Sequence, residues 1–176
     1  MFPKTTRVPD LALTLASSEL GFNVHAGFLD ALTTEVGIRP GHIGAVSSGS
    51  YVGGLYAAGV PARDIHTILS SNEMLKSVIE LKSPLRGMGM LFNKGGFTGL
   101  ISGRKLALYL KKHLGNRNIE DCENAELSIA VTNLTKGCPE IIKKGPLVDF
   151  IVASCSVPGL FKCQKISGYE YCDGAV

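Results

Sequence analysis

Gly44-Ala-Val-Ser-Ser-Gly49 is the most informative stretch of the sequence, because it joins the end of a short apolar strand to a helix through small residues. A nucleophilic serine is exposed by a sharp, strained turn of this kind, which crowds the residues two before and two after it. Ser47 has Ala45 and Gly49 at those positions, whereas its neighbour Ser48 has the larger Val46 two residues before it. The spacing favours Ser47 as the candidate nucleophile. The alternative is a strand-to-helix turn without chemistry.

The segments on either side of this turn alternate between strand and helix patterns. The apolar run 11–16 predicts a buried parallel strand, and apolar residues at helical spacing predict a helix over 22–36. Pro40-Gly41 indicates a turn, followed by a strand over 42–46 and a Gly- and Ala-rich helix over 48–59. Such alternation is typical of a parallel sheet with covering helices.

The rest of the chain continues the α/β pattern. Residues 61–115 are expected to be mainly helical, apart from the Gly-, Met- and Phe-rich segment 85–99, which we expect to form a loop over a binding site. Further predicted elements are a strand over 126–134 that pairs with 140–144, a helix over 147–154 and a hairpin over 161–173. We therefore expect one domain over 1–176, a three-layer α/β/α fold with a mainly parallel central sheet. The chain stops soon after Asp173, so we also expect this domain to be incomplete at its C-terminal end.

The composition limits the function classes. With 176 residues, 45% apolar and 19% charged, the chain can form a globular core. Its net charge of +3 is spread along the sequence, which argues against a nucleic-acid partner. Five cysteines without C-x-x-C spacing argue against a disulfide framework or a zinc site and favour a reducing, cytoplasmic location. We expect no signal peptide and no transmembrane segment, which leaves peripheral contact with a membrane open.

The candidate base is a carboxylate. A hydrolase triad would need a histidine after the nucleophile, but neither His66 nor His113 follows a recognisable strand end. A carboxylate within hydrogen-bond reach of the serine can accept the proton directly. Asp173 ends a predicted hairpin strand, and Gly174 after it leaves room for a partner to approach. An ordinary Asp-Gly turn is the alternative.

These stretches together resemble the patatin-like phospholipases, which share a Ser–Asp dyad, a G-x-S-x-G elbow and a D-G-[AG] motif. Residues 43–59 resemble the elbow with its helix, 153–161 the approach to the aspartate, and Tyr171-Cys-Asp-Gly-Ala175 the second motif. Residues 11–32 resemble the first strand and helix. The resemblance implies a lipid acyl hydrolase that forms an acyl-enzyme, with Ser47 as nucleophile, Asp173 as base, and no metal or cofactor.

The family also has a glycine-rich loop after the first strand, whose N–H groups hold the oxyanion. The matching stretch 16–21 is Ala-Ser-Ser-Glu-Leu-Gly and departs from that pattern, with Glu19 adding a negative charge. Backbone N–H groups survive these replacements. The resemblance implies an oxyanion backbone formed by Ser17, Ser18, Gly21, Ser48 and Gly49. The departure leaves two alternatives to hydrolysis open: acyl transfer by the same dyad, and an inactive lipid-binding family member.

Overall fold

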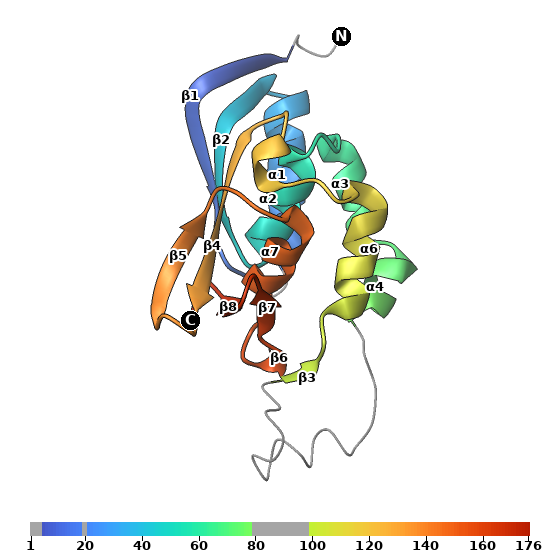
Figure 1. Ribbon diagram of the computed structural model, residues 1–176. Helices are drawn as coiled ribbons and strands as arrows, with labels where there is room; N and C mark the ends of the chain where they lie inside the picture. The colour runs from blue at the N-terminus through green and yellow to red at the C-terminus, as the bar shows by residue number, and fades with distance from the viewer. Residues whose placement is uncertain (1–4, 19–20, 79–98) are drawn as a thin grey trace.

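The computed structural model describes residues 5–18, 21–78 and 99–176 (Figure 1). Glu19 and the segment 85–98 of the predicted loop lie outside the described residues. In the described part, α-helices pack on a mixed β-sheet, and a short two-stranded sheet lies at one end. The predicted α/β class is confirmed.

The main sheet has six strands, and its two parallel pairs are β1–β2 and β2–β4. The remaining pairs, β4–β5, β4–β8 and β7–β8, are antiparallel, and short turns join β4 to β5 and β7 to β8. Parallel pairing is therefore only part of the sheet. The strands are β1 (Thr6–Leu15), β2 (Ile38–Val46), β4 (Glu126–Asn133), β5 (Cys138–Ile142), β7 (Gln164–Ile166) and β8 (Tyr169–Asp173). The small parallel sheet consists of β3 (Gly99–Ile101) and β6 (Gly159–Phe161).

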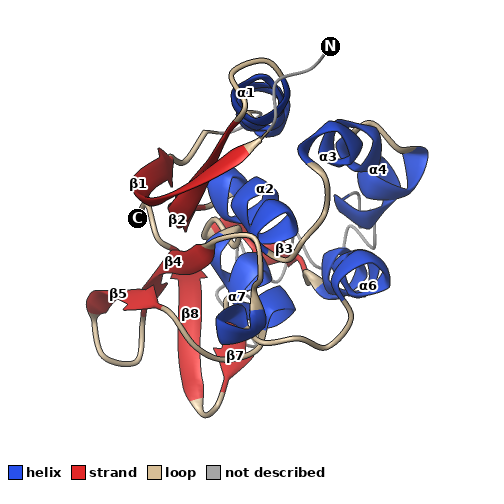
Figure 2. Ribbon diagram, turned by 90° about the horizontal axis from the view of Figure 1, so that it is seen from above, coloured by secondary structure: helices blue, strands red, loops and turns tan. Residues whose placement is uncertain are grey.

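Helices α1 (Phe22–Thr34), α2 (Ser48–Ala57) and α7 (Leu147–Ser154) pack against the sheet and against one another. Helices α3 (Ala62–Leu69), α4 (Asn72–Val78) and α6 (Arg104–Leu114) lie outside them, and a 3-10 turn spans Ile119–Asp121. Figure 2 shows α2 and α7 between the sheet and these outer helices. In the described part of the chain the layers thus follow the order sheet, inner helices and outer helices, instead of having helices on both faces.

Helix α2 forms the centre of the core, since all ten of its residues are buried. A Cβ at Gly53 would lie 3.0 Å from Ile43 and 3.3 Å from Ala45, so small residues let the helix lie close to β2. A Cβ at Gly54 would lie 2.4 Å from the Ile151 side chain of α7. The Gly- and Ala-rich composition of the predicted helix is therefore a packing requirement.

The predicted turn at Pro40-Gly41 is wrong, because both residues lie inside β2. Strand β1 pairs with β2 through Val8 opposite Pro40, and the register shifts before Ala12 opposite His42. A Cβ at Gly41 would lie 2.1 Å from the Pro9 carbonyl oxygen. The glycine permits this close approach of two backbones, so here it marks an irregular strand and not its end.

None of the helices in the described ranges combines the length and the apolar character that a membrane crossing requires.

Candidate active site

Ser47 occupies a strained turn between β2 and α2. Its φ of 54° and ψ of −126° are unusual for a residue with a side chain and cost about 1–3 kcal/mol. A Cβ at Gly49 would lie 2.1 Å from the carbonyl oxygen of Leu15, so α2 begins directly against the end of β1. Ala45 is buried beneath α2. The close packing on both sides accounts for the small residues that flank the predicted nucleophile.

Side chains from α7 and α2 hold the backbone of Ser47 in this conformation. The Ser47 N–H donates to the Ser154 hydroxyl at 2.8 Å, and that hydroxyl donates to the carbonyl of Ala130 at 2.8 Å. The Ser47 carbonyl accepts from the Ser50 hydroxyl at 2.6 Å and from the Cys155 thiol at 3.1 Å. Burial raises the pKa of the Cys155 thiol to about 12, so this group stays a neutral donor. The elbow is therefore fixed by tertiary contacts.

Asp173 ends β8 with its carboxylate inside the protein, where the residue is 1% exposed. One carboxylate oxygen, Oδ1, accepts from the Ala175 N–H at 2.9 Å. The other, Oδ2, is buried and has no hydrogen-bond partner among the described residues. The Asp173 N–H donates to the carbonyl of Ser156 at 2.9 Å. A Cβ at Gly174 would lie 2.5 Å from the carbonyl oxygen of Ala130, so only glycine fits after the aspartate.

The register of the sheet places the strand ends next to Ser47 and at Asp173 beside each other on one edge of β4. Strand β2 pairs with the first part of β4 and ends with Val46 opposite Ala130. Strand β8 runs the other way and ends with Asp173 opposite the next residue of β4, Val131. Because β5 occupies the other edge of β4 along this stretch, β2 and β8 must meet end to end on one edge. No hydrogen bond joins the two side chains in this structure, although catalytic contacts of this kind often form only with substrate.

The loop that follows β1 is tied to the elbow. The Ser18 N–H donates to the Ser48 hydroxyl at 3.1 Å, and the two hydroxyls are also 3.1 Å apart. The His25 Nε2 atom lies 2.9 Å from the carbonyl oxygen of Ala16 and 3.4 Å from the Ser18 hydroxyl. A Cβ at Gly21 would lie 1.8 Å from that hydroxyl. The Ser18 N–H is thus already engaged, and His25 holds the loop from the first helix.

A largely apolar cavity of about 480 Å³ opens beside the elbow. Its polar lining comes from Ser17, Ser47 and Ser48, close to where α2 begins. The Tyr51 ring packs edge-to-face on Phe22, and its hydroxyl donates to the Met74 sulfur at 3.3 Å. Burial raises the pKa of Tyr51, so its hydroxyl stays neutral. The apolar lining is formed by Phe22, Tyr51, Met74, Val78, Leu106, Cys155, Val157, Leu160 and Phe161.

Two of the side chains that hydrogen-bond the backbone of Ser47 were not among the residues that the sequence predicted. Ser154 and Cys155 lie at the C-terminal end of an apolar helix, and both fall in the stretch 153–161, whose sequence resembled the approach to Asp173 and suggested no role for either residue. A polar residue at the end of such a helix, shortly before a proline, was the one available signal.

Comparisons with known proteins place this geometry in context. A family model described as patatin-like phospholipase matches residues 21–176. A patatin-like phospholipase domain-containing protein of Caenorhabditis elegans is 28% identical over 159 residues, which cover 86% of this chain and 13% of that protein. The crystal structure of VipD from Legionella pneumophila superposes with a TM-score of 0.54 at 16% identity, over 96% of this chain and 46% of that one. The chain thus spans less than half the length of either protein, and the structural likeness concerns the fold.

Proposed function

The chain belongs to the patatin-like phospholipase family, and from this premise we propose that it hydrolyses fatty-acyl esters of lipids, with Ser47 as nucleophile and Asp173 as base. One observation carries the proposal. The strands that carry the strained serine and a buried carboxylate with an unpartnered oxygen end next to each other on one edge of β4, and the serine lines an apolar cavity. A buried carboxylate oxygen without a partner is costly, and a functional site is the usual reason to keep one.

In the proposed first step, Asp173 Oδ2 accepts the proton of the Ser47 hydroxyl while Oγ bonds to the ester carbonyl carbon. The tetrahedral intermediate collapses, the bond to the alcohol breaks, and Asp173 returns the proton to the departing oxygen. In the second step a water molecule gives a proton to Asp173 and attacks the acyl-enzyme. The fatty acid leaves and Ser47 recovers its proton. The two side chains must move into hydrogen-bond contact when substrate binds.

The backbone N–H groups at the start of α2 are the best-placed hydrogen-bond donors for the oxyanion. The first four N–H groups of a helix have no partner inside the helix and carry its positive dipole end. Ser48 is the first residue of α2 and lines the cavity together with Ser47. The Ser18 N–H could contribute only after its hydrogen bond to the Ser48 hydroxyl opens. We therefore propose the Ser48 N–H as the main donor and the backbone at Ser17 as the second.

The cavity supports an acyl chain as the group bound beside the nucleophile. Its walls beyond the serines are hydrocarbon, aromatic and sulfur surfaces, among them Met74, Leu106 and Phe161. Buried apolar surface contributes about 25 cal/mol for each Å² removed from water, so a fatty chain gains most by entering it. A polar headgroup would remain outside. The ester carbonyl then lies at the boundary, next to Ser47.

The test is release of fatty acid from phosphatidylcholine vesicles, followed by mass spectrometry. Ser47→Ala and Asp173→Asn should each remove turnover. Ser167→Ala is the matched control, because Ser167 is the other described serine with a left-handed backbone, at φ 50°, but lies in an exposed turn. It should keep wild-type activity. Full turnover in either dyad variant would sink the proposal, and lipid binding without turnover in the wild type would favour an inactive lipid-binding domain.

A further inference from the structure

Besides Asp173, three residues have a buried polar side-chain atom without a hydrogen-bond partner among the residues that the structure describes. These atoms are the Tyr56 hydroxyl oxygen, Arg39 Nε and Asp30 Oδ1. A buried donor without an acceptor is costly, so a ligand that supplies the acceptor is one reason to keep it. Tyr56 lies in the last turn of α2 and Arg39 near the start of β2. The chain turns back at Ser47 and α2 packs on β2, so these two donors lie at the same end of the sheet.

A second arginine lies directly beside Arg39. Arg7 of β1 is the register partner of Arg39 in the parallel pair, so both side chains leave the same face of the sheet. Arg39 shares that face with Ile43 and Ala45, which contact α2 at Gly53. Like charges opposite each other on neighbouring strands are destabilising. Within the described ranges no carboxylate forms an ion pair with either arginine.

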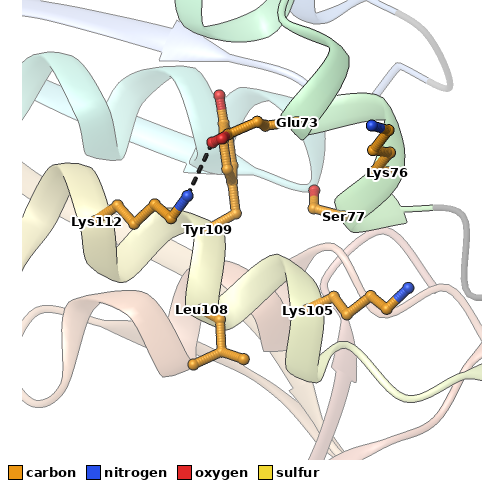
Figure 3. Close-up of a pocket in the computed structure, with 7 residues that line it drawn as sticks. All are labelled: Glu73, Lys76, Ser77, Lys105, Leu108, Tyr109 and Lys112. Atoms are coloured by element: carbon orange, nitrogen blue, oxygen red, sulfur yellow. Dashed lines mark hydrogen bonds and ion pairs between the residues drawn. The ribbon is translucent and has the colours of Figure 1, made fainter.

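Ion pairs elsewhere in the protein show the contrast. In Figure 3 Lys112 extends from α6 toward Glu73 of α4, and its Nζ lies 2.9 Å from a carboxylate oxygen. The Nζ of Lys136 lies 2.7 Å from a carboxylate oxygen of Glu140. In both pairs the protein itself supplies the counter-charge. The described part of the chain supplies none for the two neighbouring arginines, so an external anion is the group that would complete their surroundings.

The Tyr56 hydroxyl is within electrostatic reach of both guanidinium groups. Burial raises the pKa of Tyr56, and the positive charges of Arg39 and Arg7 oppose this rise. The hydroxyl therefore stays protonated and can donate a hydrogen bond. Asp30 lies on α1 and forms no ion pair with either arginine in the part of the chain that the structure describes. The region thus gathers two positive charges and a neutral donor.

We propose that Arg7, Arg39 and Tyr56 bind the phosphate group of a phosphate monoester. A guanidinium donates two parallel hydrogen bonds to phosphate oxygens. The monoester dianion offsets both arginines, whereas a carboxylate or a phosphate diester carries a single negative charge. Arg7 is exposed and Arg39 is half-buried, so the group can enter from solvent. The nine residues of β2 separate this site from Ser47 by about 25 Å, so it is distinct from the candidate active site.

The experiment measures binding of glycerol 3-phosphate, a soluble monoester, by calorimetry and by its effect on Tm. The Tm of the wild type should rise, because a ligand that binds only the folded state stabilises it. Arg39→Gln and Arg7→Gln should each bind about 10- to 100-fold more weakly, as expected for the loss of a charged hydrogen bond. Arg104→Gln is the matched control, since it removes the same charge from an exposed position at the start of α6. It should bind like the wild type.

Tyr56→Phe separates a ligand contact from a structural role. It removes a buried hydroxyl that has no partner in the described structure, so the ligand-free Tm should stay equal or rise while binding weakens. A lower ligand-free Tm with unchanged binding would show that the hydroxyl is structural and would overturn the proposal. An equal rise in Tm for wild type and Arg39→Gln would overturn it as well, because a general salt effect would then explain the rise.

Vesicles that contain phosphatidic acid present the same monoester on a lipid and identify its source. Binding of glycerol 3-phosphate supports a soluble ligand. Sedimentation with the vesicles alone, lost in Arg39→Gln and kept in Arg104→Gln, supports a lipid headgroup. Binding to neither would overturn the proposal and would leave the proposed hydrolysis at Ser47 unaffected.

Discussion

Ser154→Ala tests whether the elbow is held in place from α7. In the wild type the Ser154 hydroxyl accepts the Ser47 N–H and donates to Ala130, each at 2.8 Å, and the side chain is fully buried. Alanine removes one oxygen atom and leaves the backbone of α7 unchanged. The Ser47 N–H then loses its acceptor in a place that water does not reach. Because the turn at Ser47 is strained, we expect it to relax once this restraint is lost.

The expected magnitudes follow from these contacts. A buried donor without an acceptor costs about 1–3 kcal/mol in the free energy of unfolding. For a domain of this size each kcal/mol lowers Tm by about 2–4 °C. Displacement of a nucleophile by roughly 1 Å reduces the rate about 100-fold, so kcat should fall by about 10- to 100-fold. KM should change little, because Ser154 does not line the cavity.

The assay is kcat and KM for fatty-acid release together with Tm, measured in parallel for Ser156→Ala. Ser156 is also a fully buried serine of the same turn, and its hydroxyl donates to the Val152 carbonyl at 2.7 Å. Its hydrogen bond with Asp173 uses the backbone carbonyl of Ser156, which alanine retains. Ser156→Ala should lower Tm but keep kcat. Wild-type kcat in Ser154→Ala, or an equal fall in kcat in both variants, would refute the positioning role.

Two further predictions concern backbone strain and thiol chemistry. Ser47→Gly should be more stable than Ser47→Ala by about 1 kcal/mol in urea unfolding. Glycine relieves about 1–3 kcal/mol of backbone strain at this position, which exceeds the roughly 0.5–1 kcal/mol of conformational entropy that it costs on folding. Equal stability of the two variants would show that the elbow is not strained. At pH 8 iodoacetamide should modify the exposed Cys138 but not Cys155, because burial raises the pKa of the Cys155 thiol to about 12, well above the pH of the assay. Rapid alkylation of Cys155 in the native protein would contradict this burial.

The sequence predicted the elements around the elbow well, because small-residue packing and hydrophobic spacing there agree with the tertiary structure. The helix beginning at Phe22, the helix after Ser47 and the hairpin around Gly168 all occur. The starts of β1 and β2 were placed too late. The first half of β1 is largely exposed and includes Pro9, while the first residues of β2 are half-buried or buried and include Pro40. Prolines carry no strand signal, and pairing between the two segments makes them strands.

The sequence could not show how the sheet closes around the candidate site. A hairpin pattern predicts that β7 and β8 are antiparallel to each other, but it does not predict which edge of β4 they join. That edge is set by β5, which occupies the opposite side of β4. The same limit applies to Ser154, since a buried serine on an apolar helix gives no periodic signal for a partner 107 residues earlier in the chain. Ser47 and Asp173 could be proposed as candidates because their neighbours must be small, and Gly49 and Gly174 reflect that requirement.

The most direct test of the central claim is modification by a fluorophosphonate, with the labelled peptide mapped by mass spectrometry. An activated serine attacks this reagent, whereas an ordinary buried hydroxyl does not. The account predicts an adduct on Ser47 in the wild type, none in Ser47→Ala, and labelling slower by about 100- to 10,000-fold in Asp173→Asn, the usual contribution of a general base. Labelling of Asp173→Asn at the wild-type rate, or an adduct on another serine, would contradict it.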